Sequence, residues 1–415
     1  MPTFNEDGYQ SALIGDRARN RRGRVVDHAE IYGRGGLPAR VIDMPADVSM
    51  SRGIEVENDH EDVIDAELKR LDLVGNMSDA LRWSRLDGGS ALLLMTEDGQ
   101  LFEPLPDEIS RITEIRVIEL NQISVAPGGY YSDPNLDNYG EPEIYQITPN
   151  AFTGGRASFF NVHESRLFPV YGDPLPQRIR TTLTVPWAGR SAADKPFATI
   201  ANYERALVLS LEVLKRKQQA VHKMKGLVQM LQTDDGEKQV RKRVDLVDEV
   251  RSLMNGVAVD SDDDYNVYDQ SVSGLKELLG EFQVAVSADT GIPVTALFGR
   301  SASGLNSTGE NDLEGLYDLC EGLQRTSAQP AIHRLIKAIC TQRGTSWPGD
   351  WKIKWPSLWT PTDAQQAETR FKNAQADKAE ADARQVDFDI GLVSEVELRA
   401  DAVNDGRYGL GVKDG

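Results

Sequence analysis

Residues 195–226, KPFATIANYERALVLSLEVLKRKQQAVHKMKG, form the most informative stretch of the chain. Apolar side chains recur there three, four or seven residues apart, at Ile200, Tyr203, Leu207, Leu211, Leu214, Val221 and Met224. This spacing predicts a single amphipathic helix over the whole stretch. At 1.5 Å per residue, about 29 helical residues would reach roughly 43 Å. The polar face becomes basic toward Gly226, where we expect the helix to end.

A second long helix is predicted from Ser273 to about Thr290, with one face formed by Leu275, Leu279, Phe282 and Val286. Between the two helices, we expect a charged helix over Gly236–Met254 and a strand near Tyr265–Tyr268. The pattern therefore predicts a stalk of two helices with a small α/β insertion at its tip. Such a stalk is unusual for an enzyme.

The segment after the second helix begins with a loop of small and hydroxyl-bearing residues, GRSASGLNSTG at 299–309. A helix is then predicted from Glu310 to Arg343, with a kink at Pro330, because proline lacks an N–H donor and clashes with the preceding turn. Residues 347–359, in which tryptophan and proline alternate, are expected to be extended. Another helix is predicted over 361–386.

The first 194 residues combine helix and strand signals. Glu61–Trp83 predicts one helix to Leu73, a break near Gly75 and a second helix. The apolar run Ser90–Thr96 has the length of a strand, and residues 111–171 carry further strands separated by turns. Four prolines make 172–196 an extended crossing segment. Together these signals predict an α+β fold.

Charge and composition restrict the possible functions. The chain carries 46 basic and 65 acidic residues, a formal charge of −19. Nucleic-acid affinity comes mainly from cations against phosphates, so this balance argues against a protein that holds DNA statically. The same balance suits a surface past which DNA slides, and it also serves solubility. No apolar run approaches about 18 residues, so we expect no membrane contact.

The search for catalytic chemistry finds no constellation. Cys320 and Cys340 are the only cysteines, which excludes a disulfide framework and indicates a reducing cytoplasm. None of the five histidines pairs at metal-ligand spacing, so neither a metal nor another cofactor is expected. The acidic run Asp260–Asp264 resembles the start of a calcium loop, but Tyr265 replaces its turn glycine and Ser271 its closing glutamate.

One triplet supports an alternative function. His163-Glu164-Ser165 fits the His-x-Ser/Thr element of two-histidine phosphoesterases, and with the aspartate run it suggests a phosphoesterase or nuclease acting on nucleic acid or nucleotides. That chemistry requires two such elements facing one phosphate, and no second element occurs. We therefore interpret the triplet as part of a strand.

Several motifs resemble those of phage portal proteins. The most specific is Gly304-Leu305-Asn306-Ser307-Thr308-Gly309-Glu310-Asn311-Asp312, preceded by Gly291-Ile292-Pro293 and Leu297-Phe298-Gly299. Arg82–Gly89, Pro127–Tyr145, Trp355–Leu358 and Gly391–Arg399 also fit. The likeness covers nearly the whole chain. It is closest to a phage-associated portal family, once described as a domain of unknown function, whose members are sometimes fused to an anti-CBASS phosphoesterase.

The resemblance implies a portal anatomy with a mixed α/β wing, two stem helices, a small α/β clip and a helical crown region. In this sequence it assigns 1–24 to a flexible arm, 25–194 to the wing, 195–225 to stem helix 1, 226–270 to the clip, 271–298 to stem helix 2, 299–309 to a tunnel loop, 310–360 to a kinked wing helix and strand, and 361–415 to crown-side helices. The paired histidine elements of the fused phosphoesterase do not appear, so cleavage of cyclic nucleotides is not expected.

The resemblance also implies candidate functional residues. The tunnel loop would present Arg300, Ser301, Ser303, Asn306, Ser307 and Thr308 to DNA. Basic residues at the end of stem helix 1, namely Lys215, Lys217, Lys223 and Lys225, would either touch phosphates in the channel or pair with acidic residues across a subunit interface. The clip would dock partners through Arg241, Lys242 and Arg243. No catalytic residue is expected.

The implied function is a non-enzymatic ring, usually a dodecamer, through which double-stranded DNA is packaged and ejected. Its partners would be the terminase large subunit, head–tail connector or adaptor proteins, and the major capsid and scaffold proteins. The protein would sit at the portal vertex of the virion, after assembly in the host cytoplasm. A minor capsid or scaffolding protein without a channel is a further alternative, but it gives no reason for the loop at 299–309.

Overall fold

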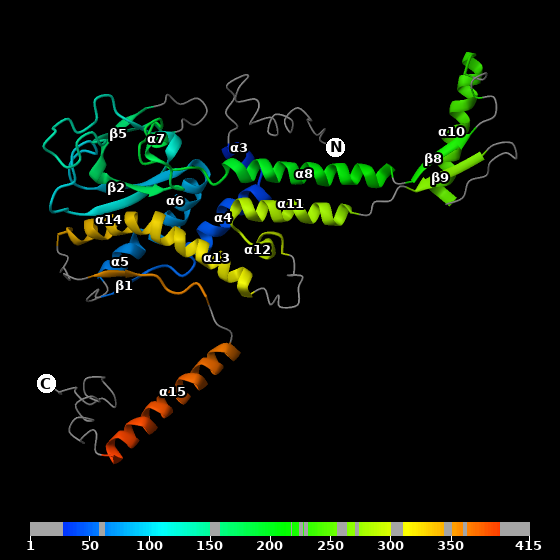
Figure 1. The fold of residues 1–415 in the computed structure, drawn as a ribbon. Helices are drawn as coiled ribbons and strands as arrows, with labels where there is room; N and C mark the ends of the chain where they lie inside the picture. Colours follow the sequence, from blue (N-terminus) through cyan, green and yellow to red (C-terminus); the bar gives the residue numbers. More distant parts are fainter. Residues whose placement is uncertain are drawn as a thin grey trace. The chain divides into compact units, whose positions relative to one another are not determined.

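The computed structural model describes residues 28–57, 63–149, 158–216, 218–223, 227, 231–254, 264–269, 274–299, 310–343, 351–359 and 363–390. The chain divides into two units, 1–358 and 359–415, which we describe separately. The ribbon in Figure 1 shows the elements of both units, and the mixture of helices and strands confirms the predicted α+β fold.

The first unit is built around strand β2 (Gly89–Thr96), which is buried along its first six residues. It pairs antiparallel with β3 (Ile112–Glu119) on one side and β7 (Leu167–Tyr171) on the other. Side chains of successive strand residues point to opposite faces. Leu92 and Leu94 therefore join one core cluster, while Ala91 and Leu93 join another.

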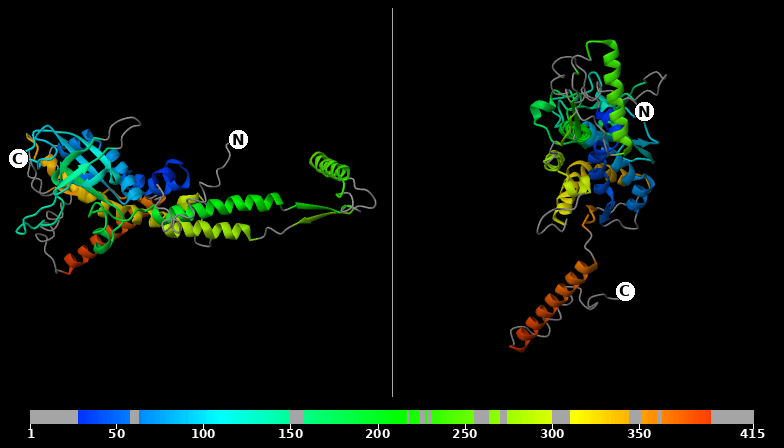
Figure 2. Two further views of the ribbon diagram at one scale, coloured as in Figure 1. Left: turned by 90° about the horizontal axis from the view of Figure 1, so that it is seen from above. Right: turned by 90° about the vertical axis from the view of Figure 1, so that its right-hand side faces the viewer.

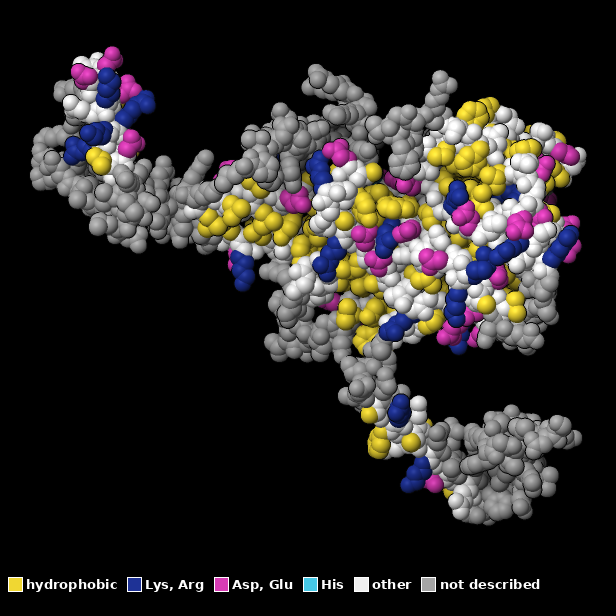
Figure 3. Space-filling model, turned by 180° about the vertical axis from the view of Figure 1, so that it is seen from behind, with side chains coloured by type: hydrophobic (Ala, Val, Ile, Leu, Met, Phe, Trp, Pro, Cys, Tyr) yellow, Lys and Arg dark blue, Asp and Glu magenta, His cyan; other side chains and the backbone are white. Residues whose placement is uncertain are grey.

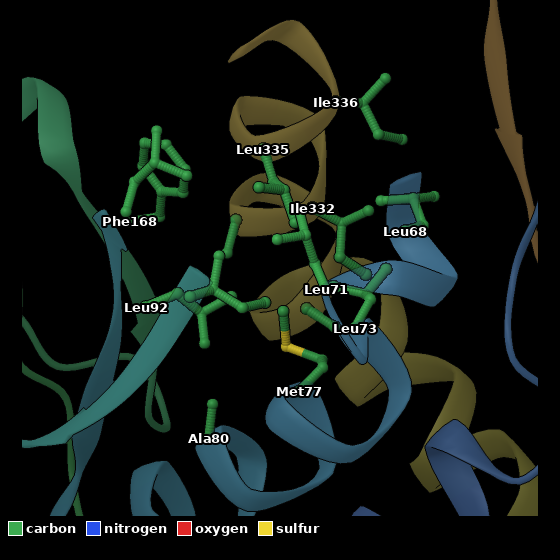
Figure 4. Packing of buried hydrophobic residues seen from close by; sticks show 14 of the residues in the cluster. Leu68, Leu71, Leu73, Met77, Ala80, Leu92, Phe168, Ile332, Leu335 and Ile336 are labelled. Carbon is green, nitrogen blue, oxygen red and sulfur yellow. The ribbon is translucent and has the colours of Figure 1, made fainter. Parts of the chain in front are cut away.

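The first of these clusters lies between the sheet and three helices: α5 (Val63–Arg70), α6 (Leu73–Asp87) and α14 (Gln329–Cys340). Figure 4 shows Leu92 and Phe168 from the strands facing Met77, Ile332 and Leu335 from the helices. Ile332, Leu335 and Ile336 recur at three- and four-residue spacing and are fully buried. The apolar stripe predicted beyond Pro330 thus contacts the sheet.

The second cluster packs the other face of β2 against a separate antiparallel sheet. That sheet has the order β4 (Ile123–Val125), β5 (Ile144–Ile147) and β6 (Phe160–His163). A one-turn 3-10 helix (Glu164–Arg166) connects β6 directly to β7. Farther from the core, β1 (Glu55–Glu57) pairs antiparallel with β10 (Lys352–Lys354), so segments nearly 300 residues apart meet.

The break between α5 and α6 lies at Leu71-Asp72, earlier than the predicted break near Gly75. Asp72 adopts a left-handed conformation with φ of 47°, and its side chain accepts a hydrogen bond from the Gly75 amide as an N-terminal cap. Gly75 itself lies inside α6. The break lies at Asp72 because the side chain of this residue caps the first turn of α6. Gly75 does not break the helix, because a glycine is tolerated within a helical turn.

Helices α8 (Asp194–Arg216) and α11 (Leu275–Thr290) lie side by side, as Figures 1 and 2 both show. The prediction that the first helix continues to Gly226 is wrong. Residues Gln218–Lys223 instead form strand β8, which pairs antiparallel with β9 (Asp264–Asp269). An apolar spacing of seven residues, from Leu214 to Val221, fits a helix, but backbone pairing with a distant strand overrides it.

The charged helix predicted over Gly236–Met254 is confirmed as α10 (Asp234–Met254). Helices α3 (His28–Gly33) and α4 (Leu37–Met50), which the sequence did not predict, precede the sheets in the chain. The short α12 (Val294–Phe298) follows α11, and the crossing segment contains the short α7 (Gln177–Arg180) and the first residues of α8. The remaining strand prediction, at 111–171, agrees with β3 to β7.

The helix predicted from Glu310 is interrupted ahead of Pro330, as expected, and the interruption is a π-helical turn. Helix α13 (Glu310–Leu323) leads into the π-helical segment Gln324–Ala328, and α14 begins at Gln329. Pro330 occupies the first turn of α14, where its missing N–H costs little. The wider π turn accommodates the ring without ending the helix.

The second unit contains helix α15 (Asp363–Asp389), which confirms the helix predicted over 361–386. The rest of the segment assigned to crown-side helices, 391–415, lies outside the described residues. None of the helices in the described part of the chain combines the length and hydropathy needed to cross a membrane.

Candidate functional site

The roots of α8 and α11 are joined by polar contacts. The Nζ atom of Lys195 lies 2.7 Å from Oδ1 of Asp289, and the Thr199 hydroxyl donates to Oδ2 of the same carboxylate at 2.6 Å. One turn farther along α8, the amide nitrogen of Gln283 donates to the Tyr203 hydroxyl at 3.0 Å. These bonds set the register of the two helices at the end nearest the sheets.

An apolar core lies beneath the same root. Phe197 and Ile200 of α8, Val286 of α11 and Ile292 are buried in one cluster with Leu316 of α13. The Tyr203 ring meets the Phe298 ring edge to face at 5.6 Å, so α12 packs under the pair as well. The first three turns of α8 are thus held by side chains from several elements.

Beyond Tyr203, α8 carries apolar side chains that are left exposed. Leu207, which belongs to the stripe predicted from sequence, is 36% exposed, and Leu211 is 58% exposed. Their exposed neighbours are Val208, Leu209, Val213 and Leu214, and α11 adds Leu278 and Val284. Figure 3 shows hydrophobic side chains gathered over this helix pair. We call these eight exposed side chains, which are spread around both helices, the stem apolar face; exposed apolar side chains gathered in this way are typical of an association surface.

The basic residues predicted at the end of stem helix 1 do not share one helix. Lys215 lies in the last turn of α8, whereas Lys223 ends strand β8 opposite Asp264. Lys217 and Lys225 lie outside the described residues. The prediction that these residues form the basic end of one continuous helix is therefore wrong, because the helix stops at Arg216.

The candidate docking residues lie on α10. The Arg241 guanidinium is bound to Glu237 of the same helix at 2.8 Å and remains 76% exposed. Lys242 is exposed and Arg243 is half-buried. The helix therefore presents a short run of cations, of which Arg241 is already partly neutralised.

The tunnel-loop candidates, Arg300, Ser301, Ser303, Asn306, Ser307 and Thr308, lie outside the described residues. The structure does place both ends of this loop. Gly299 ends α12 with φ of 64°, a left-handed conformation that favours glycine, and its amide donates to the Thr295 carbonyl at 2.9 Å. Glu310 starts α13. The loop therefore follows α12, which packs beside the root of the α8–α11 pair, and precedes α13.

The His163–Ser165 triplet has a structural role in this geometry. His163 is buried at the end of β6, and its Nδ1 lies 2.9 Å from the Ser165 hydroxyl. That hydroxyl also accepts a hydrogen bond from the Leu105 amide at 2.8 Å. Burial lowers the pKa of His163, which keeps the ring neutral. The interpretation of the triplet as part of a strand holds for His163, which ends β6, but Glu164 and Ser165 instead form the 3-10 turn that leads into β7.

Arg166, the next residue, was not singled out in the sequence although it is fully buried. Its guanidinium donates to the carbonyls of Glu103 and Asp98 and to the Thr96 hydroxyl. It thereby fastens the 97–105 loop to strands β2 and β7. Its place directly before the apolar run Leu167–Val170 is the only sequence signal, and arginines rarely lie fully buried.

Metal and thiol chemistry find no support in the described part of the chain. No three histidine, cysteine or acidic side chains gather there as metal ligands would. Burial raises the pKa of the Cys320 thiol to about 11, so this thiol stays protonated at neutral pH.

A cleft of about 880 Å³ opens on the wing. It lies between the 131–142 loop, strands β5 and β7, the crossing segment at 177–187 and the exposed side of α14. Its aromatic lining includes Tyr131, Tyr145, Tyr171 and Trp187. The sequence signal was the density of tyrosine and proline between 130 and 187, but only the fold brings them together.

Comparison with known proteins agrees with this geometry. The family model described as "Phage portal protein" matches residues 27–379. The chain is 28% identical over 316 residues to "Anti-CBASS protein Acb1" of Caulobacter sp. (strain RHG1), covering 74% of this chain and 49% of that protein. The chain thus spans about half the length of this curated relative.

Two solved structures show the same fold at low sequence identity. One is titled "Virion of native gene transfer agent (GTA) particle", with a TM-score of 0.55, 16% identity, and coverage of 94% of this chain and 98% of that chain. The other is titled "Neck of native GTA particle computed with C12 symmetry", with a TM-score of 0.54, 15% identity and the same coverages. With the family match over most of its length, the chain belongs to the phage portal protein family.

Proposed function

We propose that this chain is the subunit of a ring-shaped portal at one capsid vertex, through which double-stranded DNA is packaged and ejected. The observation that carries the proposal is the stem apolar face on a helix pair whose root is firmly anchored. Burying these side chains between subunits breaks no contact within the subunit and removes apolar area from water. A second copy of the chain, rotated about a common axis, supplies the cover.

The family match and the solved structures support a ring. One structural neighbour was computed with C12 symmetry, and a closed ring of twelve identical subunits needs only one heterologous interface. The formal charge of −19 suits a conduit, because a wall that repels phosphate does not hold DNA in place. In this assignment the protein works without catalysis, as a virion component that is assembled in the host cytoplasm and does not contact a membrane.

The loop at 299–309 is proposed to face the DNA. It follows α12, which packs against α8, and its glycine and serine residues carry little side-chain bulk, so many copies fit around one axis. Arg300 is the single basic residue of the loop. For Lys215, Lys217, Lys223 and Lys225 both roles stay open, either phosphate contact in the channel or pairing with acidic residues across subunits.

Partners are assigned by the family resemblance and by exposure. Arg241, Lys242 and Arg243 on α10 are proposed to dock the terminase large subunit and later the connector or adaptor proteins. The wing would contact the major capsid and scaffold proteins, and α15 would belong to the crown side. Reversing the three α10 charges should weaken terminase docking, measured as binding of purified terminase to purified rings. Unchanged binding would place the docking surface elsewhere.

Electron microscopy of the purified protein, with particle mass from light scattering, tests the ring directly. We expect rings with a hole wide enough for duplex DNA. Leu211→Asp should abolish them, because it places a charge in the proposed interface, while Glu97→Gln in the exposed 97–105 loop, away from the helix pair, should leave them intact. A wild-type protein that stays monomeric under all assembly conditions would refute the proposal.

The loop is tested separately. Deleting residues 301–306 should leave ring assembly intact and impair DNA packaging, measured as packaged genome per particle. Loss of the ring instead would show that the loop supports assembly rather than DNA passage.

A further inference from the structure

The wing cleft combines aromatic surfaces with carboxylates. Tyr131, Tyr145, Tyr171 and Trp187 line it, and Tyr171 meets Trp187 edge to face at 6.4 Å. Glu141 and Glu164 also line the cleft, close enough for their charges to act on Tyr131. Aromatic faces beside carboxylates are suited to a guanidinium, which stacks on a ring while it donates hydrogen bonds.

The charges of the cleft are arranged unevenly. Glu164 is paired with Arg334 of α14 at 3.2 Å, and that guanidinium also lies over the Phe168 ring. Glu141 forms no ion pair with any described cation, and Glu143 lies close enough to act on Tyr131. Burial and the charges of Glu164 and Glu143 raise the pKa of Tyr131. The Tyr131 end is therefore negative, whereas the one other arginine, Arg180, lies on the crossing segment.

The chain itself carries a matching cationic segment. Residues 17–24, RARNRRGR, contain five arginines in a protein of net charge −19. These residues precede the first described residue, His28, whose ring packs against Phe197 and lies 3.4 Å from Asp194. The arm thus joins the structure at the start of α8.

The chain between the cleft and that point limits their separation to about 25 Å. Trp187, which lines the cleft, precedes Asp194 by only seven residues. The arginines lie four to eleven residues before His28, a reach of roughly 14 to 39 Å for an extended chain. The arm therefore needs no neighbouring subunit to reach the cleft.

We propose that the arginine-rich segment 17–24 binds in the wing cleft of its own subunit, with guanidinium groups stacked on Tyr131 and Trp187 and paired with Glu141. Binding would tie the arm across the crossing segment that carries the stem helix. The inference does not depend on ring formation, because cleft and arm belong to one chain.

Hydrogen–deuterium exchange of the full-length chain tests this docking. Replacing all five arginines with glutamine should speed amide exchange at least threefold in 131–142 and 177–187, because the covering segment is released. A synthetic peptide of residues 12–27 should restore protection in that variant and change nothing in the wild type. Unchanged exchange in the glutamine variant would overturn the proposal.

Matched variants separate specific docking from general charge attraction. Glu141→Gln should weaken peptide binding to the glutamine variant at least fivefold, while Glu277→Gln on α11 should not affect it. A peptide with lysine in place of arginine should bind several-fold more weakly, because an ammonium group does not stack as a guanidinium does. If Glu141→Gln and Glu277→Gln weakened peptide binding equally, or if the arginine and lysine peptides bound equally well, the proposed specific binding in the cleft would be refuted.

Crosslinking decides which subunit supplies the arm. In a Cys340→Ser background, Arg21→Cys and Tyr139→Cys should be joined by a bismaleimide within single subunits, because Tyr139 is an exposed neighbour of the cleft. The expected product runs as a monomer on a denaturing gel. A ladder of covalent dimers and higher species would assign the arm to the neighbouring subunit and overturn the proposal.

Discussion

Lys195 and Asp289 form an ion pair of 2.7 Å between the first turn of α8 and the last turn of α11. The pair lies at the end of the two helices nearest the sheets, and the Thr199 hydroxyl donates to the other carboxylate oxygen. Beyond it, the same helices expose the stem apolar face. One end of the helix pair is therefore packed against other elements of the same subunit. The other end leaves its apolar side chains exposed unless another surface covers them.

The Asp289 pair predicts a pH dependence of stability. Burial pushes the carboxyl pKa upward, but hydrogen bonds from Lys195 and Thr199 outweigh that effect, so the pKa lies below its usual range. The resulting stabilisation is present above the unfolded pKa, near 4, and is lost as pH falls through the lower folded pKa. Asp289→Asn should destabilise the subunit by about 1 kcal/mol at neutral pH. Its melting temperature should fall less steeply in acid than that of the wild type; parallel curves would contradict the assignment.

Replacing leucine by alanine is expected to affect mainly assembly at Leu211 and mainly subunit stability at Leu335. Leu335→Ala removes a fully buried side chain between α14 and the sheet and should cost about 2–5 kcal/mol in denaturant unfolding. Leu211→Ala removes a side chain that is 58% exposed and should change subunit stability by no more than about 0.5 kcal/mol. In sedimentation, Leu211→Ala should weaken assembly although the stability of its subunit is unchanged, whereas Leu335→Ala should affect stability more than assembly. A large loss of subunit stability at Leu211 would mean that the stem apolar face is already covered.

Arg166 predicts a large cost for losing one buried guanidinium. Arg166→Met should leave the carbonyls of Glu103 and Asp98 without their donor and lower the free energy of unfolding by about 2–4 kcal/mol. Arg116→Met is the matched control, because that arginine is exposed on the neighbouring strand and pairs only with Glu114. The control should cost less than about 1 kcal/mol. Similar losses for both variants would show that the buried contacts carry little energy.

The buried His163 predicts a second loss of folding stability as pH falls, in the same direction as that of Asp289. Its pKa is lowered by burial, so the unfolded chain binds a proton more readily than the folded one. The stabilisation is complete above the unfolded pKa of about 6.5 and declines as pH falls toward and through the folded pKa. Melting temperatures across this range should fall for the wild type and stay flatter for His163→Gln. Neither this variant nor Ser165→Ala should change any phosphoesterase activity, and abolition of a measured activity would revive the alternative function.

Local patterns predicted most helices and strands correctly. The run Ser90–Thr96 reads as a buried strand because both of its faces are covered, by helices on one side and by a second sheet on the other. Pro330 predicts the interruption that the structure places at Gln324–Ala328, since the cause lies in the residue's own covalent geometry.

The errors have a common physical origin. The stretch Gln218–Lys223 continues a helical spacing, yet it forms a strand because Asp264–Asp269, more than forty residues away, offers backbone partners. The helix break moved from Gly75 to Asp72 because a side-chain cap forms there. In both cases the outcome depended on which groups meet in space.

The sequence by itself determined the α+β class, the order of the main helices, the acidic balance and the resemblance to portal proteins, because these depend on periodicity, composition and motif. Only the tertiary structure decided which apolar residues of the stem are buried and which are exposed, since Ile200 and Leu211 belong to one stripe but only Ile200 has neighbours that cover it. The same holds for the wing cleft, whose tyrosines come from a loop and two strands. Burial and proximity follow from the packing of distant segments, which no local pattern contains.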